Sequence, residues 1–325
     1  MTMQKLKQQL KNLKQNEPLK NHTSFKIGGP AKWFYEAKNI ADFVKAVKLA
    51  RELKLNYFIL GGGTNILIND KGIDGLVIKN NCQKIEISDS KVYVESGARL
   101  AKLTDDIINA GLKGLEQIGN IPGTVGGAIW GNAGAYGIAI GDFLVKAKIL
   151  TPDNQIKEID KDYFQFKYRD SILKHNSDIL LSAELEFREK DEILELKKIR
   201  QEEQADRIKK QPQGVGTAGC FFKNLIVELS QIKDNQLLLN HFNERKQTDL
   251  AAGFLIDQAG LKGYKVGDAM VSDVHTNFIV NTGNTTASDV LELVKYIKNE
   301  VYKKFGLKLE HEVYFINQQG RKEQL

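Results

Sequence analysis

Eight glycines fall within residues 119–141, which read GNIPGTVGGAIWGNAGAYGIAIG. Such a run is unfavourable in an ordinary helix or strand, because an ordered glycine loses more backbone entropy than any other residue. Glycines instead tolerate positive φ in tight turns and let main-chain N–H groups approach phosphate oxygens. The run therefore predicts irregular backbone close to a bulky ligand, and a purely structural loop is the alternative.

A second glycine cluster lies within residues 59–69, which read ILGGGTNILIN. Apolar residues on both sides of the three glycines at 61–63 predict a strand, a tight turn and another strand. The turn's backbone donors, the Thr64 hydroxyl and the Asn65 amide would suit a pyrophosphate. The cluster lacks the Gly-Lys-Ser/Thr of a P-loop and the GxGxxG spacing of a dinucleotide fingerprint. Residues 21–31, NHTSFKIGGPA, add further hydroxyls, an amide and a Gly-Gly-Pro sequence.

Length and charge favour a globular protein that handles anionic small molecules. The chain has 325 residues, enough for two domains, and a formal net charge of +6. Nucleic acid is the rival partner for a basic protein, but the lysines are spread along the chain with no nucleic-acid-binding motif. We therefore expect no nucleic-acid partner.

Two cysteines, Cys82 and Cys220, exclude a disulfide framework and a CxxC metal site, so we expect reduced thiols and no metal. The first twenty residues lack the apolar region of a signal peptide, and no run of about 18 apolar residues exists to span a membrane. We therefore expect a cytoplasmic protein without a membrane partner.

Hydrophobic patterns predict alternating helices and strands followed by a change of composition. Residues 189–210 are highly charged with helical spacing of their apolar residues, which predicts a solvated helix that connects two domains. The predicted helices lie at the N-terminus (Leu6, Leu10, Leu13) and at 40–53, 100–110, 249–259 and 287–305. The predicted strands lie at 33–37, 57–60, 75–78, 144–150, 178–187, 276–281 and 308–316, and residues 84–96 predict a hairpin-like pair of strands.

Two segments carry side chains suited to chemistry. Arg169 follows an aromatic alternation; if that segment is extended, its guanidinium could clamp a carboxylate, although a surface arginine is the alternative. Cys220 is either an inert buried thiol or an acid or nucleophile. Lys223 and Asn224 follow it and could hold a polar substrate or end a solvent-facing strand.

Residues 307–315, LKLEHEVYF, alternate with period two and predict a strand. Glu310 and Glu312 share its polar face with Lys308, where we expect the two carboxylates to repel each other. A raised carboxyl pKa suits a proton donor near neutral pH, and a plain polar face is the alternative. His311 is expected to pack on the apolar face, which is formed by Leu307, Leu309, Val313 and Phe315.

Seven motifs occur in one order, namely NHTSFKIGG, GGGTNILI, IPGTVGGAIWGNAGAYG, YRDS, AGCFFKN, AGFLIDQAGLKG and LEHEV. Together they closely resemble the UDP-N-acetylenolpyruvoylglucosamine reductase family, flavoenzymes that make UDP-N-acetylmuramate in peptidoglycan synthesis. The resemblance runs from about residue 21 to 316. It matches the shorter subtype, because no loop insertion separates YRDS from the charged helix.

The resemblance implies an α+β fold of two domains. An N-terminal helix (1–20) would precede an FAD-binding domain of the vanillyl-alcohol-oxidase or PCMH type (21–188), with lobes at about 21–78 and 79–188. The connecting helix (189–210) would lead to a smaller α+β substrate-binding domain (211–325).

The resemblance also implies the site residues. FAD would contact Asn21, Thr23, Gly61, Gly62, Gly63, Thr64, Asn65, Gly119, Pro122, Gly123, Thr124, Gly126, Gly127, Asn132, Gly134 and Ala135. The UDP-sugar would contact Tyr168, Lys223 and Asn224. The implied partners are this sugar nucleotide and NADPH, with the protein acting as a monomer.

In this family NADPH reduces the flavin, and hydride then passes to C3 of the enolpyruvyl group before protonation at C2. Arg169 and Glu312 would orient the substrate carboxylate and stabilise the enol-type intermediate, and Cys220 would donate the proton. Most members have serine at the Cys220 position, and a thiol is the stronger acid. Leu225 and His311 stand where the family usually has proline. Another FAD-dependent oxidoreductase of the same fold is the alternative function.

Overall fold

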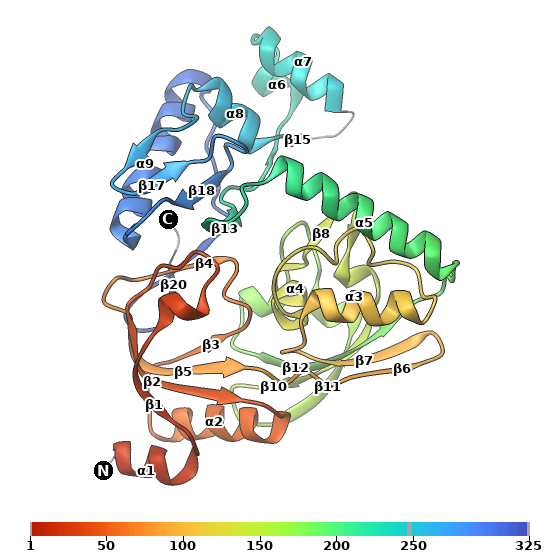
Figure 1. The fold of residues 1–325 in the computed structure, drawn as a ribbon, viewed down its shortest axis with the longest axis vertical. Helices are drawn as coiled ribbons and strands as arrows, with labels where there is room; N and C mark the ends of the chain where they lie inside the picture. Colours follow the sequence, from red (N-terminus) through yellow and green to blue (C-terminus); the bar gives the residue numbers. More distant parts are fainter. Residues whose placement is uncertain (1, 246–248, 324–325) are drawn as a thin grey trace. The chain divides into compact units, whose positions relative to one another are not determined.

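The computed structural model describes residues 2–245 and 249–323 (Figure 1). The chain forms two compact units. The first comprises Met1–Glu17, Ala31–Gly63 and Ile73–Lys209, and the second comprises Pro18–Pro30, Thr64–Gly72 and Lys210–Leu325. Two short segments near the N-terminus thus belong with the C-terminal part of the chain, although the resemblance assigns them to the FAD-binding domain. The predicted domain boundaries themselves stay predictions.

The first unit contains a four-stranded sheet in the order β1-β2-β5-β3, in which β2, β5 and β3 are parallel. Helix α2 joins β2 to β3, and Asn39 Oδ1 caps it by accepting from the Asp42 N–H at 2.9 Å. Leu6 of α1 packs with Phe43 and Val47 of α2 in one core. The bounds are α1 Thr2–Gln9, β1 Lys14–Pro18, β2 Pro30–Ala37, α2 Ile40–Glu52, β3 Tyr57–Leu60 and β5 Ile73–Asn80.

A second sheet of the first unit is antiparallel, in the order β11-β10-β12-β7-β6. Helices α3 and α4 lie over it and share its core (Figure 1). The strands are β6 Ile85–Ser88, β7 Lys91–Glu95, β10 Leu144–Leu150, β11 Ile156–Asp160 and β12 Ile179–Glu186. The other elements are α3 Leu100–Asn109, α4 Val125–Gly131, β8 Gly134–Ala135, β9 Ile138–Ala139, η2 Ile140–Asp142, η3 Lys161–Phe164, η4 Ile172–Lys174 and α5 Ile193–Lys210.

The glycine-rich run is more regular than predicted, because α4 and the small β8–β9 hairpin lie inside it. Thr124 begins α4, since its Oγ1 accepts from the Gly127 N–H at 3.3 Å. Asn132 ends the helix in the left-handed conformation with φ 44°. Capping at both ends and burial of Val125, Ala128 and Ile129 offset the low helix propensity of glycine.

The second unit has a four-stranded sheet in the order β13-β18-β17-β16. Residues of helices α8 and α9 share its core. Its other sheets are β20-β19-β4, with β19 and β4 parallel, and β14-β15. The bounds are η1 Leu19–His22, β4 Ile66–Ile68, β13 Gly216–Cys220, β14 Leu225–Ile226, α6 Leu229–Ile232, α7 Gln236–Arg245, β15 Asp249–Leu250, α8 Ala252–Gln258, β16 Lys265–Val266, β17 Ala269–Val271, β18 Phe278–Asn281, α9 Ala287–Phe305, β19 Tyr314–Ile316 and β20 Lys322–Glu323.

The predicted strand at 308–316 is wrong for most of its length, because regular pairing begins only at Tyr314. The predicted alternation is nevertheless present, since Leu307, Leu309 and Val313 are buried. His311 forms an isolated bridge with Phe222.

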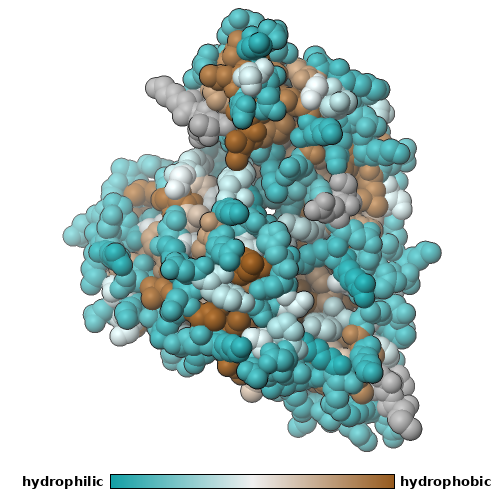
Figure 2. Space-filling view, turned by 180° about the vertical axis from the view of Figure 1, so that it is seen from behind, coloured by the Kyte–Doolittle hydropathy of each residue, from teal (hydrophilic) through white to brown (hydrophobic). Residues whose placement is uncertain are grey.

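The face shown in Figure 2 is mostly hydrophilic, with hydrophobic residues in small separate groups. Within residues 2–245 and 249–323, no helix combines the length and apolar character needed to cross a bilayer.

Candidate active site

The two glycine clusters meet in the first unit. A Cβ atom on Gly62 would lie 2.7 Å from Gly123 Cα, and one on Gly61 would lie 2.8 Å from Thr124 Oγ1. Real Cβ atoms do not approach other atoms so closely, so the main-chain contact between Gly62 and Gly123 requires glycine at position 62. We call Gly61–Gly63 with Gly123 and Thr124 the glycine cradle.

Two cations that the sequence analysis did not single out flank the glycine cradle. Lys79 of β5 donates a hydrogen bond from Nζ to the Gly61 carbonyl oxygen. Burial lowers the pKa of Lys79, with Glu36 opposing this shift and Arg99 adding to it. Arg99 immediately precedes α3, and its backbone forms an isolated antiparallel β-bridge with Thr124. The sequence offered one sign of Lys79, namely a lysine that follows the apolar residues of a predicted strand.

Bare backbone beside two cations fits a pyrophosphate, because glycine lets an anion approach the main chain and the ammonium and guanidinium groups balance its charge. The residues present therefore fit FAD. When FAD binds, Lys79, Arg99 and the backbone of the glycine cradle would hold its phosphates.

Other residues assigned to FAD have structural contacts. The Gly126 N–H donates to the Ser96 carbonyl oxygen at 2.8 Å, and a Cβ on Gly126 would lie 2.7 Å from that oxygen. Asn132 Nδ2 donates to the Lys167 carbonyl oxygen at 3.0 Å. Gly134–Ala135 form a strand of the hairpin. These residues shape the loop next to the cradle, and their contact with FAD stays a prediction.

Gly119 packs against the connecting helix. A Cβ there would lie 2.2 Å from Arg200 Nη1 of α5, and Asn120 Nδ2 donates to the Arg200 carbonyl oxygen at 3.3 Å. Arg200 also pairs with Asp105 at 2.8 Å. Helix α5 thus fixes the start of the glycine-rich run, in addition to connecting the two parts of the chain.

Arg169 lies in a turn, which corrects the expectation of an extended segment. Lys167 and Asp170 pair across the turn, and Arg169 has φ 54°. Its guanidinium carbon lies 5.0 Å from the centre of the Tyr168 ring, and Tyr168 is 46% exposed. A non-glycine residue in this conformation is uncommon, and such residues are enriched at active sites.

Cys220 and Glu312 lie on neighbouring segments of the second unit. The Glu312 N–H donates to the Phe221 carbonyl oxygen at 2.7 Å, and the Lys223 N–H donates to the Glu310 carbonyl oxygen at 2.9 Å. This pairing holds the segment that bears the thiol beside the segment that bears the carboxylate. Cys220 is the last residue of β13, and the preceding Gly219 has φ 82°.

Asn65 reinforces this arrangement, which differs from its assigned role at FAD. Its Nδ2 donates to the Glu312 carbonyl oxygen at 3.1 Å, and its own carbonyl oxygen accepts from the Tyr314 N–H at 3.2 Å. Asn65 and Thr64 belong to the second unit, whereas Gly61–Gly63 belong to the first. The GGGTN motif therefore contributes residues to both units.

Lys223 and Asn224, assigned to the substrate, already have partners. Lys223 Nζ lies 3.3 Å from Glu310 Oε2. Asn224 Nδ2 donates to Asp249 at 2.9 Å, and its Oδ1 accepts from the Ala252 N–H at 3.3 Å at the start of α8. Asn224 thus positions the start of α8, and Lys223 forms an ion pair.

The N-terminal residues assigned to FAD lie in the second unit. Thr23 is buried, and its hydroxyl donates to the Ile27 carbonyl oxygen at 3.1 Å, while Asn21 is exposed. Among the residues that the structure describes, no three His, Cys, Asp or Glu side chains group as metal ligands.

Comparison with known proteins also separates an FAD-binding part of the chain from a C-terminal part. Residues 31–160 match the FAD binding domain family, and residues 211–316 match the C-terminal domain of UDP-N-acetylenolpyruvoylglucosamine reductase. The reductase of Anoxybacillus flavithermus is 38% identical over 98% of this chain and 100% of its own length. That of Caldanaerobacter subterraneus subsp. tengcongensis is 38% identical over 97% of each chain. The crystal structure of the reductase (MurB) from Thermus caldophilus has a TM-score of 0.73 at 32% identity, covering 94% of this chain and 98% of that one.

The fold and the two matched domains define an FAD-containing oxidoreductase with a separate C-terminal domain. The chain belongs to the UDP-N-acetylenolpyruvoylglucosamine reductase family. The predicted family, the α+β fold class and the FAD cofactor are therefore confirmed.

We predict that Lys79→Met weakens FAD binding about tenfold or more, because the loss of a partly buried, charged hydrogen-bond donor costs about 1.5–3 kcal/mol. Lys48→Met, an exposed lysine on α2, is the matched control. Flavin fluorescence titration of the apoprotein measures both dissociation constants, and thermal unfolding of the apoproteins checks the fold. Equal FAD affinity in the two variants would contradict the assignment of Lys79.

Proposed function

We propose that this chain reduces the enolpyruvyl group of UDP-N-acetylglucosamine enolpyruvate with NADPH and bound FAD, forming UDP-N-acetylmuramate for peptidoglycan synthesis. One observation carries the proposal, namely the 2.7 Å hydrogen bond from the Glu312 N–H to the Phe221 carbonyl oxygen. It holds a thiol and a carboxylate on adjacent segments within the domain that matches the reductase family. Homology over nearly the whole chain gives further support.

The roles of the chain's own residues follow from their chemistry. FAD, when bound, supplies the hydride transfer between NADPH and the substrate. The Arg169 guanidinium is assigned to the substrate carboxylate, because a guanidinium can bind a carboxylate with two hydrogen bonds. Glu312 stabilises and orients the enol form that develops as C3 is reduced. Cys220 donates its thiol proton to C2, and the thiolate regains a proton from water before the next turnover.

We also propose a monomer that works in the cytoplasm on small molecules and without nucleic acid. Support comes from the substrates, which are nucleotides of the cell interior, and from the modest net charge of +6 spread along the chain. The absence of a disulfide framework in the sequence is in keeping with a reducing compartment.

The function is tested by turnover in D₂O with NADPH and UDP-N-acetylglucosamine enolpyruvate, with the product followed by proton NMR. We expect NADPH oxidation to depend on the sugar nucleotide, the vinyl protons to disappear, and deuterium to enter at C2. If NADPH were oxidised while the vinyl protons persisted, the chain would be an FAD-dependent oxidoreductase for another substrate.

Cys220→Ser should retain substantial activity, because a hydroxyl can occupy the same position and carry the same proton. Cys220→Ala should keep flavin reduction by NADPH but lose about 10²–10⁴-fold in turnover of the sugar nucleotide, the usual contribution of a general acid. Rapid-mixing absorbance separates the two half-reactions. Normal turnover by the alanine variant would remove Cys220 from the mechanism.

Glu312→Gln should slow reoxidation of the flavin by the sugar nucleotide about 10²–10³-fold, because a preorganised charge at the developing enol is lost. Glu292→Gln, an exposed carboxylate on α9, is the control and should leave both half-reactions unchanged. Flavin reduction by NADPH should be unchanged in both. A block of that first half-reaction in Glu312→Gln would place the carboxylate elsewhere in the cycle.

A further inference from the structure

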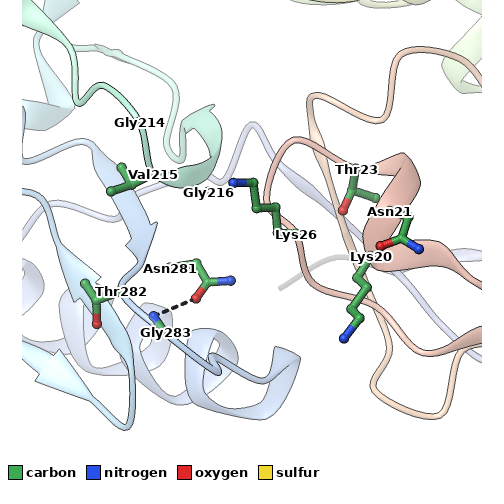
Figure 3. Close-up of a pocket in the computed structure, with 10 residues that line it drawn as sticks. All are labelled: Lys20, Asn21, Thr23, Lys26, Gly214, Val215, Gly216, Asn281, Thr282 and Gly283. Carbon is green, nitrogen blue, oxygen red and sulfur yellow. Dashed lines mark hydrogen bonds between the residues drawn. The ribbon is translucent and has the colours of Figure 1, made fainter.

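A pocket in the second unit lies outside the residues used in the proposed reaction. Three segments line it, namely 20–26, 214–216 and 281–283 (Figure 3), and its volume is about 760 Å³. All three belong to the second unit, so the pocket is complete within it. Asn21 and Thr23, which the resemblance assigns to FAD, lie on its wall.

Hydrogen bonds between the segments fix the walls. Ser24 Oγ donates to the Thr217 carbonyl oxygen at 2.7 Å, and the Thr217 N–H donates back to the Ser24 carbonyl oxygen at 3.2 Å. Asn281 Nδ2 donates to the Phe25 carbonyl oxygen at 3.2 Å, and its Oδ1 accepts from the Gly283 N–H at 3.0 Å (Figure 3). The pocket is therefore held in shape before any ligand enters.

The pocket carries positive charge without a matching acid. Lys20 and Lys26 stand on one wall, and Lys26 extends toward the opposite wall in Figure 3. Both side chains are exposed, and within residues 2–245 and 249–323 no carboxylate pairs with either. The lining contains no aspartate or glutamate.

Lys26 is held in an uncommon backbone conformation. Its φ is 57°, a value that favours glycine. The Lys26 N–H donates to the Thr23 carbonyl oxygen at 3.3 Å, and the buried Thr23 hydroxyl donates to the Ile27 carbonyl oxygen at 3.1 Å. A glycine or asparagine would meet this geometry with less strain, so a lysine here is in keeping with a function for its charge.

A carboxylate does approach one rim, where a Cβ on Gly283 would lie 2.7 Å from Asp268 Oδ2. That oxygen accepts a hydrogen bond from the Asn284 N–H at 2.8 Å. Asp268 lies outside the lining, and its charge is partly compensated by this backbone donor and by the Thr282 hydroxyl at its own carbonyl oxygen. The two lysines therefore set the sign of the potential in the pocket.

We propose that this pocket binds the phosphate groups of a phosphorylated small molecule. Lysine ammonium groups bind phosphate as point charges, and the Asn21 amide lines the same space as a neutral donor. NADPH, the sugar nucleotide and a separate phosphorylated effector share this chemistry. The proposal stands without the proposed function, since binding is measured without turnover.

The test is calorimetric titration of the FAD-loaded full chain with inorganic pyrophosphate. Lys20→Met and Lys26→Asn should each weaken binding about fivefold, the upper range for an exposed ion pair, and Lys20→Arg should restore it. Asparagine tolerates the left-handed backbone, so Lys26→Asn removes charge with little strain. Lys295→Met, an exposed lysine on α9, is the control and should bind like the wild type. Absence of binding heat, or equal affinity in all variants, overturns the proposal.

Steady-state kinetics of the same variants then identify the source of the phosphate. A raised KM for NADPH alone assigns the pocket to the reductant, and a raised KM for the sugar nucleotide alone assigns it to the substrate. Weakened pyrophosphate binding with both KM values unchanged assigns it to a separate effector. Because calorimetry needs no turnover, failure of the proposed activity would leave the binding result intact.

Discussion

Close contact between main chains at the glycine cradle limits what can occupy the centre of the first unit. Gly62 and Gly123 approach so closely that a single methyl group at position 62 would collide with the neighbouring backbone. The same contact brings Thr124, the cap of α4, to Gly61, and it leaves Lys79 and Arg99 at the edge. An anion can approach main-chain groups there because no side chain shields them.

In the proposed reaction the second unit meets a different requirement, since it must hold the Cys220 thiol and the Glu312 carboxylate in fixed positions. Backbone pairing does this between residues 221–223 and 310–312, and the Asn65 amide ties the second segment down. Side chains placed by backbone hydrogen bonds pay little reorganisation when charge develops, which is the basis of electrostatic catalysis. In the proposed reaction, cofactor binding thus depends on close contact between glycines, and proton transfer depends on backbone pairing between two segments.

Patterns of burial and capping could be predicted from the sequence, whereas local turns and long-range contacts could not. Helix α9 matches its predicted bounds, because Thr286 and Asp289 form a capping box and Gly306 ends the helix. The turn at Arg169 was missed although Lys167 and Asp170 close it locally, because the aromatic alternation before it favoured an extended segment. The helix inside the glycine run was missed because its burial depends on partners distant in sequence. Lys79 was overlooked because its contact with Gly61 arises only when β3 and β5 pair.

The central claim is that one bound FAD passes electrons from NADPH to an enolpyruvyl sugar nucleotide. Anaerobic stopped-flow absorbance of the purified protein tests it most directly, with NADPH added first and UDP-N-acetylglucosamine enolpyruvate second. We expect NADPH to bleach the flavin band and the sugar nucleotide to restore it rapidly. A band that bleaches but does not return would leave the flavoprotein fold in place and contradict the assigned substrate.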